Sequence, residues 1–346
     1  MVNNNTGKLR IALDAMGGDF APENEILGAI EAFSSGMLNK DDTEIVLIGN
    51  EQKIKKCLAA NEVHDMCYSI VHADEVVMME DDPTEVIKTK KNSSLYIAAK
   101  MQADGDADAL VSTANTGAVM AISTVLLGRI KGVSRPTIGT FLPGDSPKPV
   151  LLVDAGANVD CKPLFLYEFG VMGGIYVSQM LDIAKPRIGL LSVGSEDKKG
   201  NDVVRAAHQM LRQNPNINFI GNVEGGDIML GKCDVVVCDG FTGNVVLKFA
   251  ESMSKLLKVK FKNYAERGLS NKLLMGMAMP ALKDVFKEFN YEEYGGVPLI
   301  GVNGVSIIGH GKSSPKAVKN MIFKAVETVR RDVNKHIGTA LAEANK

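Results

Sequence analysis

Short apolar runs typical of buried β-strands alternate with helical patterns along almost the whole chain. Some of these runs, such as VLLVD at Val150–Asp154, are apolar up to their last residue, which indicates strands covered on both faces. The expected strands are Leu9–Asp14, Glu44–Gly49, Tyr68–Ala73, Ala109–Ser112, Thr137–Leu142, Val150–Asp154, Arg187–Val193, Ile217–Gly221, Asp234–Asp239, Val297–Val302 and Val305–Gly309. The alternation predicts an α/β fold with a mostly parallel sheet wrapped by helices.

The segments between these strands carry apolar residues at helical spacing. The expected helices are Glu23–Ser34, Asn92–Ala103, Gly117–Arg129, Leu164–Leu181, Asp202–Arg212, Asn244–Tyr264 and Pro315–His336. A chain of 346 residues can form one large α/β domain or two smaller ones. Because no internal repeat, low-complexity tract or long linker divides it, we expect a single domain over residues 1–346.

One segment departs from the alternation. A long helix leads into Arg267–Lys283, and no strand signal returns before Gly296, so we expect a helical hairpin inserted at about residues 245–295. Its uncharged stretch Leu273–Leu282 is too short to span a bilayer. The stretch suits either a core or dimer-interface helix, or a tip that dips into a membrane surface. The residues assigned to a membrane or partner surface are Leu273, Leu274, Met275, Met277, Lys258 and Lys262.

Charge and composition narrow the possible partners. The formal charge of −2 argues against a general nucleic-acid binder. From Lys248 to Lys272, however, seven basic residues stand against two acidic ones, which suits anionic lipid or an acidic protein. The five cysteines show no metal-ligand spacing, so no metal is expected. The N-terminal sequence has no signal-peptide core, and we expect a cytosolic protein.

The turns after the first strand and after strand 109–112 are candidate ligand sites, because ligands bind beyond the carboxyl ends of parallel strands. Two aspartates flank a pair of glycines in the first turn, which is more than a tight turn needs. The second turn opens a helix, and it either caps that helix or cradles a phosphate on free N–H groups. These candidates are Asp14, Gly17, Gly18, Asn115, Thr116 and Gly117.

The strands at 150–154, 187–193 and 234–239 also end in polar turns. In the first, a lysine is either a solvated residue or a point charge for an anionic substrate. The second is mostly an ordinary charged loop and resembles a phosphate loop only loosely. The third opens a long helix, as a plain cap or as a second anion site. These candidates are Asp154, Asn158, Lys162, Gly194, Asp239, Thr242, Gly243 and Asn244.

His310 ends the last strand, where a general acid or base would be useful, although a lone histidine is more often structural. The sequence has no Walker A, GxGxxG, HExxH, CxxC or GxSxG motif, which argues against nucleotide hydrolysis, a dinucleotide cofactor and a serine nucleophile. The candidate turns thus offer anion binding without a strong covalent nucleophile. This combination suits a reaction in which phosphate itself attacks.

Ten stretches, in one order over roughly residues 9–335, carry a family resemblance. They are IALDAMGGDFAPE (Ile11–Glu23), KKNSSL (Lys90–Leu95), ANTGAV (Ala114–Val119), GRIKGVSRP (Gly128–Pro136), VDAGANVDCKP (Val153–Pro163), VGSEDKKGN (Val193–Asn201), FIGNVEGGD (Phe219–Asp227), CDGFTGNVVLK (Cys238–Lys248), YGGVPLIGVNG (Tyr294–Gly304) and GHGKSS (Gly309–Ser314). Together they resemble the PlsX family of bacterial phosphate acyltransferases. Thr113 departs from the family pattern, which usually has a smaller residue there.

The resemblance implies that inorganic phosphate attacks the thioester of a fatty acyl-[acyl carrier protein], giving acyl phosphate for bacterial phospholipid synthesis. It implies a homodimer with a Rossmann-like α/β/α sandwich, related to phosphate acetyltransferases and isopropylmalate dehydrogenases, and no metal or organic cofactor. The acyl phosphate would pass to a membrane glycerol-3-phosphate acyltransferase, PlsY. The implied location is the cytoplasm, peripherally at the inner face of the cell membrane.

Within that reaction, the Asn115–Gly117 turn is expected to hold phosphate, helped by Lys162 and Asn158. The Thr242–Asn244 turn and His310 would face the thioester. The residues assigned to catalysis are His310, Lys162, Asn244, Asp154 and Asp239, with the two aspartates orienting the others. Two alternatives stay open: a phosphate acetyl- or butyryltransferase that uses coenzyme A thioesters, and a membrane-surface scaffold that binds acyl carriers without turnover.

Overall fold

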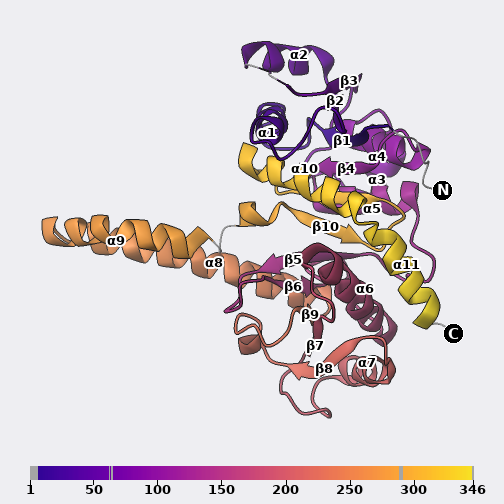
Figure 1. The fold of residues 1–346 in the computed structure, drawn as a ribbon, viewed down its shortest axis with the longest axis vertical. Coiled ribbons are helices and arrows are strands. Elements are labelled where there is room, and N and C mark those ends of the chain that lie inside the picture. The colour runs from indigo at the N-terminus through magenta and orange to yellow at the C-terminus, as the bar shows by residue number, and fades with distance from the viewer. Residues whose placement is uncertain (1–6, 62, 64, 288–290, 345–346) are drawn as a thin grey trace.

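The computed structural model describes residues 7–61, 63, 65–287 and 291–344, and its eleven strands form one sheet (Figure 1). The strands are β1 (Leu9–Asp14), β2 (Thr43–Gly49), β3 (Tyr68–His72), β4 (Ala109–Ser112), β5 (Thr137–Leu142), β6 (Val150–Val153), β7 (Arg187–Leu191), β8 (Asn218–Val223), β9 (Val235–Val237), β10 (Val297–Ile300) and β11 (Val305–Ile308). Their order across the sheet is β3-β2-β1-β4-β11-β10-β5-β6-β9-β7-β8. Each of them was predicted, because continuous apolar runs mark buried strands well.

The helices agree with the sequence-based expectations less closely than the strands do. They are α1 (Glu23–Ser34), α2 (Glu51–Ala60), α3 (Pro83–Thr89), α4 (Ser94–Asp104), α5 (Thr116–Leu127), α6 (Pro163–Leu181), α7 (Asp202–Gln213), α8 (Gly240–Ala265), α9 (Leu269–Lys287), α10 (Pro315–Arg330) and α11 (Val333–Ala344), with short 3₁₀ turns at Gly225–Asp227 and Tyr291–Tyr294. The single helix expected from Pro315 is broken, because Asp332 adopts a left-handed φ of 48°. Helices α2 and α3 were not predicted, and α2 buries only Ile54 and Leu58.

Helices cover both faces of the sheet. On one face, α1, α2 and α10 pack on the β1–β4 half, and α6, α7 and α11 pack on the β6–β9 half. On the other face, α3, α4 and α5 pack on the first half and α8 begins over the second. Among the described helices, α6 alone is long and apolar enough to cross a membrane, but it lies in the core against β9 and α7.

The sheet runs in two directions, although seven of its ten strand pairings are parallel. β10 is antiparallel to β11 and β5, and β6 is antiparallel to β5. The block β6-β9-β7-β8 therefore points opposite to the block β3-β2-β1-β4-β11. Consequently the polar turns leave the sheet in opposite directions instead of forming one row.

Helices α8 and α9 form the expected hairpin, which extends away from the sheet (Figure 1). The turn between them is at residues 266–268, so Leu273–Leu282 lies within α9 and is not the tip. Of the residues assigned to a surface there, Met275 is buried, whereas Leu273, Leu274 and Met277 are exposed. Lys258 and Lys262 on α8 are exposed as well. Residues 288–290 of the expected insertion lie outside the described residues.

Candidate active site

A first group of polar residues lies at the carboxyl ends of β1, β4 and β11. Asp14 ends β1 and is fully buried. Its Oδ2 accepts a hydrogen bond from the Ser112 hydroxyl at 2.7 Å, and its Oδ1 accepts one from the Met16 amide at 3.2 Å. Burial raises the pKa of Asp14, and the Ser94 side chain, the Ser112 hydroxyl and the Met16 amide oppose the shift only in part.

The glycine turn after β1 is packed tightly against its neighbours. A Cβ at Gly17 would lie 2.6 Å from Asp14 Oδ2 and 2.8 Å from the Ala114 amide nitrogen. A Cβ at Gly18 would lie 2.4 Å from Glu25 Oε1 and 2.9 Å from Thr113 Oγ1. Glycine is therefore needed here for close approach of three segments, and the turn forms the floor of the group rather than an open cradle.

Asn115 caps helix α5, and both polar atoms of its side chain make hydrogen bonds within the protein. Its Oδ1 accepts a hydrogen bond from the Ala118 amide at 3.1 Å, and its Nδ2 donates to the Met79 carbonyl at 2.6 Å. The amides of Thr116 and Gly117 are the first N–H groups of the helix, and Thr116 is exposed. An anion at this helix terminus would therefore meet Thr116 and Gly117, while Asn115 fixes the shape of the turn.

His310 lies at the neighbouring strand end, because β11 pairs with β4 and Ile308 stands opposite Ser112. The His310 ring is exposed, and its Nδ1 accepts a hydrogen bond from the Lys312 amide at 3.1 Å. That bond assigns the proton of the neutral ring to Nε2. The structure thus brings His310 close to the two turns that follow β1 and β4.

A second group surrounds Asp154, which follows β6 and is also fully buried. Its Oδ1 accepts hydrogen bonds from the Gly156 and Ala157 amides at 3.0 and 2.9 Å. Its Oδ2 accepts hydrogen bonds from the Asn158 amide and side chain at 2.7 and 2.8 Å. Burial raises the pKa of Asp154, and all four of these donors oppose the shift. Asp154 thereby holds the loop at residues 154–158 in one shape.

The start of α8 sits directly on that loop. The Gly240 amide donates to the Asn158 carbonyl at 2.7 Å, and Asn158 Nδ2 also donates to the Pro136 carbonyl at 2.9 Å. A Cβ at Gly243 would lie only 1.8 Å from the Asp154 carbonyl oxygen. No side chain fits at this crossing, so Gly243 is required by packing.

The first turn of α8 is capped by Asp239, whose two carboxylate oxygens accept hydrogen bonds from the Thr242 amide and hydroxyl at 2.8 and 2.9 Å. Asn244, one turn further, is exposed and lies over the loop: a Cβ at Gly156 would be 3.7 Å from its Oδ1. Lys162 is exposed at the start of α6. Asn244 and Lys162 are therefore the members of this group that a substrate can reach most directly.

The two groups share an apolar cluster. Ala114 and Ala118 of the first group belong to the same cluster as Ala155, and Ala157 and Leu247 pack against it. Both groups therefore border one face of the sheet. Gly194 follows β7, which pairs in parallel with β9, the strand that leads to Asp239. Its loop is held on the other side by β8, where Asn222 Nδ2 donates to the Glu196 carbonyl at 2.8 Å.

Sequence reasoning missed Glu25 and Thr113. Glu25 is 1% exposed, and its Oε1 accepts a hydrogen bond from the Thr113 hydroxyl at 2.8 Å. The available signal was helical spacing, since Glu25 lies on the same face of α1 as Ala29 and Ala32, which are buried. A carboxylate on the apolar face of a helix marks an unusual site.

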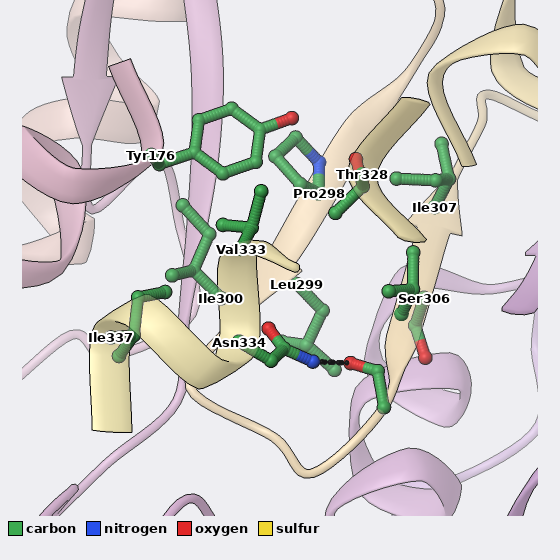
Figure 2. Close-up of a pocket in the computed structure, with 12 residues that line it drawn as sticks. Tyr176, Pro298, Leu299, Ile300, Ser306, Ile307, Thr328, Val333, Asn334 and Ile337 are labelled. Carbon is green, nitrogen blue, oxygen red and sulfur yellow. Dashed lines mark hydrogen bonds between the residues drawn. The ribbon is translucent and has the colours of Figure 1, made fainter. Parts of the chain in front are cut away.

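The cavity drawn in Figure 2 belongs to neither group. It lies between β10, β11, α10 and α11, and its volume is about 10 Å³, room for a single water at most. Its walls are mainly apolar, and the Asn334 side chain at its edge donates to the Gly304 carbonyl at 2.8 Å. It is a small packing defect in the core.

Comparisons with known proteins identify the family of this chain. A family profile described as "Fatty acid synthesis protein" matches residues 9–336. A "Phosphate acyltransferase" of Desulforamulus reducens is 47% identical over 93% of this chain and 94% of its own length. Another, of Pelotomaculum thermopropionicum, is 46% identical over 96% of this chain and 95% of its own length.

Solved structures share the fold at much lower identity. A phosphotransacetylase from Streptococcus pyogenes superposes with a TM-score of 0.64 at 16% identity, covering 93% of this chain and 94% of that protein. The EutD phosphotransacetylase from Staphylococcus aureus gives 0.60 at 14% identity, with the same coverage. These two likenesses confirm the expected α/β architecture. The family profile and the close relatives establish more: the chain belongs to the PlsX family of phosphate acyltransferases.

Proposed function

We propose that this chain transfers a fatty acyl group from a thioester to inorganic phosphate and releases acyl phosphate for phospholipid synthesis. Membership of the phosphate acyltransferase family supports the reaction. The observation that carries its placement is the start of α5, where the Thr116 and Gly117 amides open the helix beside buried Asp14 and exposed His310. A helix N-terminus attracts an anion through free N–H groups and the helix dipole.

In this reaction a phosphate oxygen attacks the thioester carbon, the carbonyl oxygen becomes an oxyanion, and the C–S bond breaks as the intermediate collapses. Phosphate is already anionic at neutral pH, so the site must mainly position it. In this proposal Asn244 and Lys162 donate hydrogen bonds to the oxyanion, and His310 Nε2–H donates a hydrogen bond to the sulfur, which leaves as a thiolate and takes its proton from water. Asp154 and Asp239 orient the second group through the hydrogen bonds that they accept.

The test is phosphate-dependent thiol release by variants with alanine at Asn115, Lys162, Asn244 and His310. We expect each to lose about tenfold or more in kcat/KM. Asn115→Ala would lose the shape of the phosphate turn, and the other three variants would lose a contact with the substrate. Lys185→Ala and His336→Ala are matched controls, because both side chains are exposed and lie outside the two groups. Near-normal turnover in all four site variants would refute this map of the site.

The proposed acyl donor is an acyl carrier protein. The basic residues of the hairpin, of which Lys258 and Lys262 are exposed, offer a surface for this acidic protein. Assays with acyl carrier protein and with coenzyme A thioesters of the same chain separate this donor from the phosphotransacetylase alternative. We expect Lys258→Glu with Lys262→Glu to raise KM for the carrier several-fold at low salt and less at high salt. An unchanged KM for the carrier at both salt concentrations would exclude this surface as its binding site.

We further propose a homodimer that lies in the cytoplasm and associates with the membrane surface through the hairpin. Leu273, Leu274 and Met277 are exposed on α9, next to the basic residues of α8. Sedimentation with anionic vesicles should fall on Leu274→Ser and Met277→Ser, while light scattering measures the oligomeric state of the same variants. Lost dimerisation with unchanged vesicle binding would assign this surface to the second subunit. Product transfer to a PlsY acyltransferase follows from the reaction and is tested by co-sedimentation with PlsY vesicles.

A further inference from the structure

We propose that Glu25 is a positioning residue for the phosphate turn, which it holds through Thr113, and that its ionisation weakens phosphate binding there. The inference rests on the proposed placement of phosphate at the start of α5. Glu25 itself touches no substrate in this proposal. It acts through the segment that leads into Thr116 and Gly117.

The link between Glu25 and the turn is one hydrogen bond deep in the protein. Glu25 is 1% exposed, and its Oε1 accepts the Thr113 hydroxyl at 2.8 Å. Thr113 is fully buried and stands two residues before Asn115, which caps α5. A shift of the Glu25 carboxyl is therefore transmitted to the amides that open α5.

The same carboxyl also supports the other turns of the first group. Gly18 lies against it so closely that a Cβ there would come within 2.4 Å of Glu25 Oε1 and 3.2 Å of the Gly311 carbonyl oxygen. The Asp19 amide donates to that same carbonyl at 2.7 Å. Glu25 thus lies where the turns after β1, β4 and β11 meet.

The other oxygen of Glu25 is unsatisfied. Oε2 is buried and, among the described residues, has no hydrogen-bond partner. A buried carboxylate without full hydrogen bonding favours its neutral form. Burial raises the pKa of Glu25 to about 7, the Thr113 hydroxyl opposes this shift, and the nearby Asp14 adds to it.

Among the described residues, the ionisable groups that shift the pKa of Glu25 include no positively charged one. Asp14 faces it from β1, and Cys57 interacts with it from α2. Helix α10, which packs on α1, places Lys319 3.8 Å from Glu31, in the last turns of α1 and away from Glu25. When Glu25 loses its proton, the floor of the first group gains a negative charge that opposes a phosphate ion at α5.

The experiment compares phosphate KM and kcat between pH 5.5 and 9 in the wild type, Glu25→Gln and Glu23→Gln. Glu25→Gln keeps the shape and an acceptor for Thr113 but cannot ionise. Glu23→Gln removes the same charge from an exposed position in the same helical turn. The ionisation of phosphate itself is common to all three proteins, so the ratio of their KM values isolates the side chain.

We expect the ratio of wild-type to Glu25→Gln phosphate KM to rise from about one at pH 5.5 to roughly fivefold at pH 8.5, the size of effect that a single charge exerts through protein. The change should lie in KM rather than in kcat, and Glu23→Gln should follow the wild type. A ratio that stays constant with pH would overturn the role of the charge.

Thr113 variants test the positioning link without touching Glu25. Thr113→Val, which loses the hydroxyl, should raise phosphate KM about threefold at pH 6, and Thr113→Ser should restore it. Equal KM in Thr113→Val and the wild type would overturn the link. If Asn115→Ala leaves phosphate KM unchanged, the proposed phosphate turn fails and the inference falls with it. If Asn115→Ala raises KM while Glu25→Gln follows the wild-type profile, the inference alone fails.

Discussion

Asp14 and Asp154 both follow a buried strand and are both fully buried, yet their surroundings differ. Asp154 accepts four hydrogen bonds from the loop that it begins, three of them from backbone amides. Asp14 accepts one from the Ser112 hydroxyl and one from the Met16 amide, and it shares its surroundings with a second buried acid, Glu25. Similar strand ends thus have different surroundings: one carboxylate fixes a loop, and at the other, burial raises the pKa of two neighbouring acids beside a candidate anion site.

Replacing each aspartate by alanine should give the largest difference in stability between the two strand ends. We expect Asp154→Ala to lower the free energy of unfolding by about 4 kcal/mol, because it leaves several buried donors unsatisfied at once. Asp14→Ala should cost about 2 kcal/mol, since fewer donors lose their acceptor. Urea unfolding of both variants measures the difference. A larger loss for Asp14→Ala would reverse the roles that we assign to the two strand ends.

Alanine substitutions at glycines of the two groups should give the next largest effects on stability. Gly243→Ala should cost about 3 kcal/mol, because its Cβ meets the Asp154 backbone carbonyl, which cannot move freely. Gly18→Ala should cost about 1 kcal/mol, because its nearest neighbour is the end of the Glu25 side chain. Gly276→Ala on α9, with no atom within 4 Å, should be stabilising by up to about 1 kcal/mol. Chemical denaturation should rank the three variants in this order.

The pH dependence of stability tests whether the first group holds a proton. The pKa of Glu25 rises from its ordinary 4.5 to about 7 on folding, so its contribution is complete below pH 4.5 and is lost as pH rises through about 7. We therefore expect the wild type to lose about 3 kcal/mol relative to Glu25→Gln between these pH values. Melting temperatures of both proteins from pH 4.5 to 8.5 measure this loss of stability. Parallel curves would mean that Glu25 titrates normally.

The helix caps give the smallest expected effect. Asn115 caps α5 in the first group and Asp239 caps α8 in the second. Removal of either cap by alanine should cost about 1 kcal/mol. Asn115→Ala should cost slightly more, because the Asn115 side chain also donates to the Met79 carbonyl. Thermal unfolding compares them, and a negligible loss for Asn115→Ala would show that its turn is held by other contacts.

Much of the fold could be predicted because its signals are local. Continuous apolar runs located every strand to within two residues, and the missing strand signal after Asn244 located the hairpin. The turns that carry Asp14, Asn115, Asp154 and Asp239 were chosen because each follows a strand. The position of the apolar stretch was wrong, since the helix turns at residues 266–268 and Leu273–Leu282 continues along α9.

The sequence by itself determined which residues follow each strand, because period and turn chemistry act over a few neighbouring positions. Only the tertiary structure decided which of those residues meet. The antiparallel strands β10 and β5 turn the second block of the sheet around, and pairing between distant segments has no local signal. The contact between Glu25 and Thr113 joins positions 88 residues apart, and only the packing of α1 against the turn after β4 brings these two side chains together.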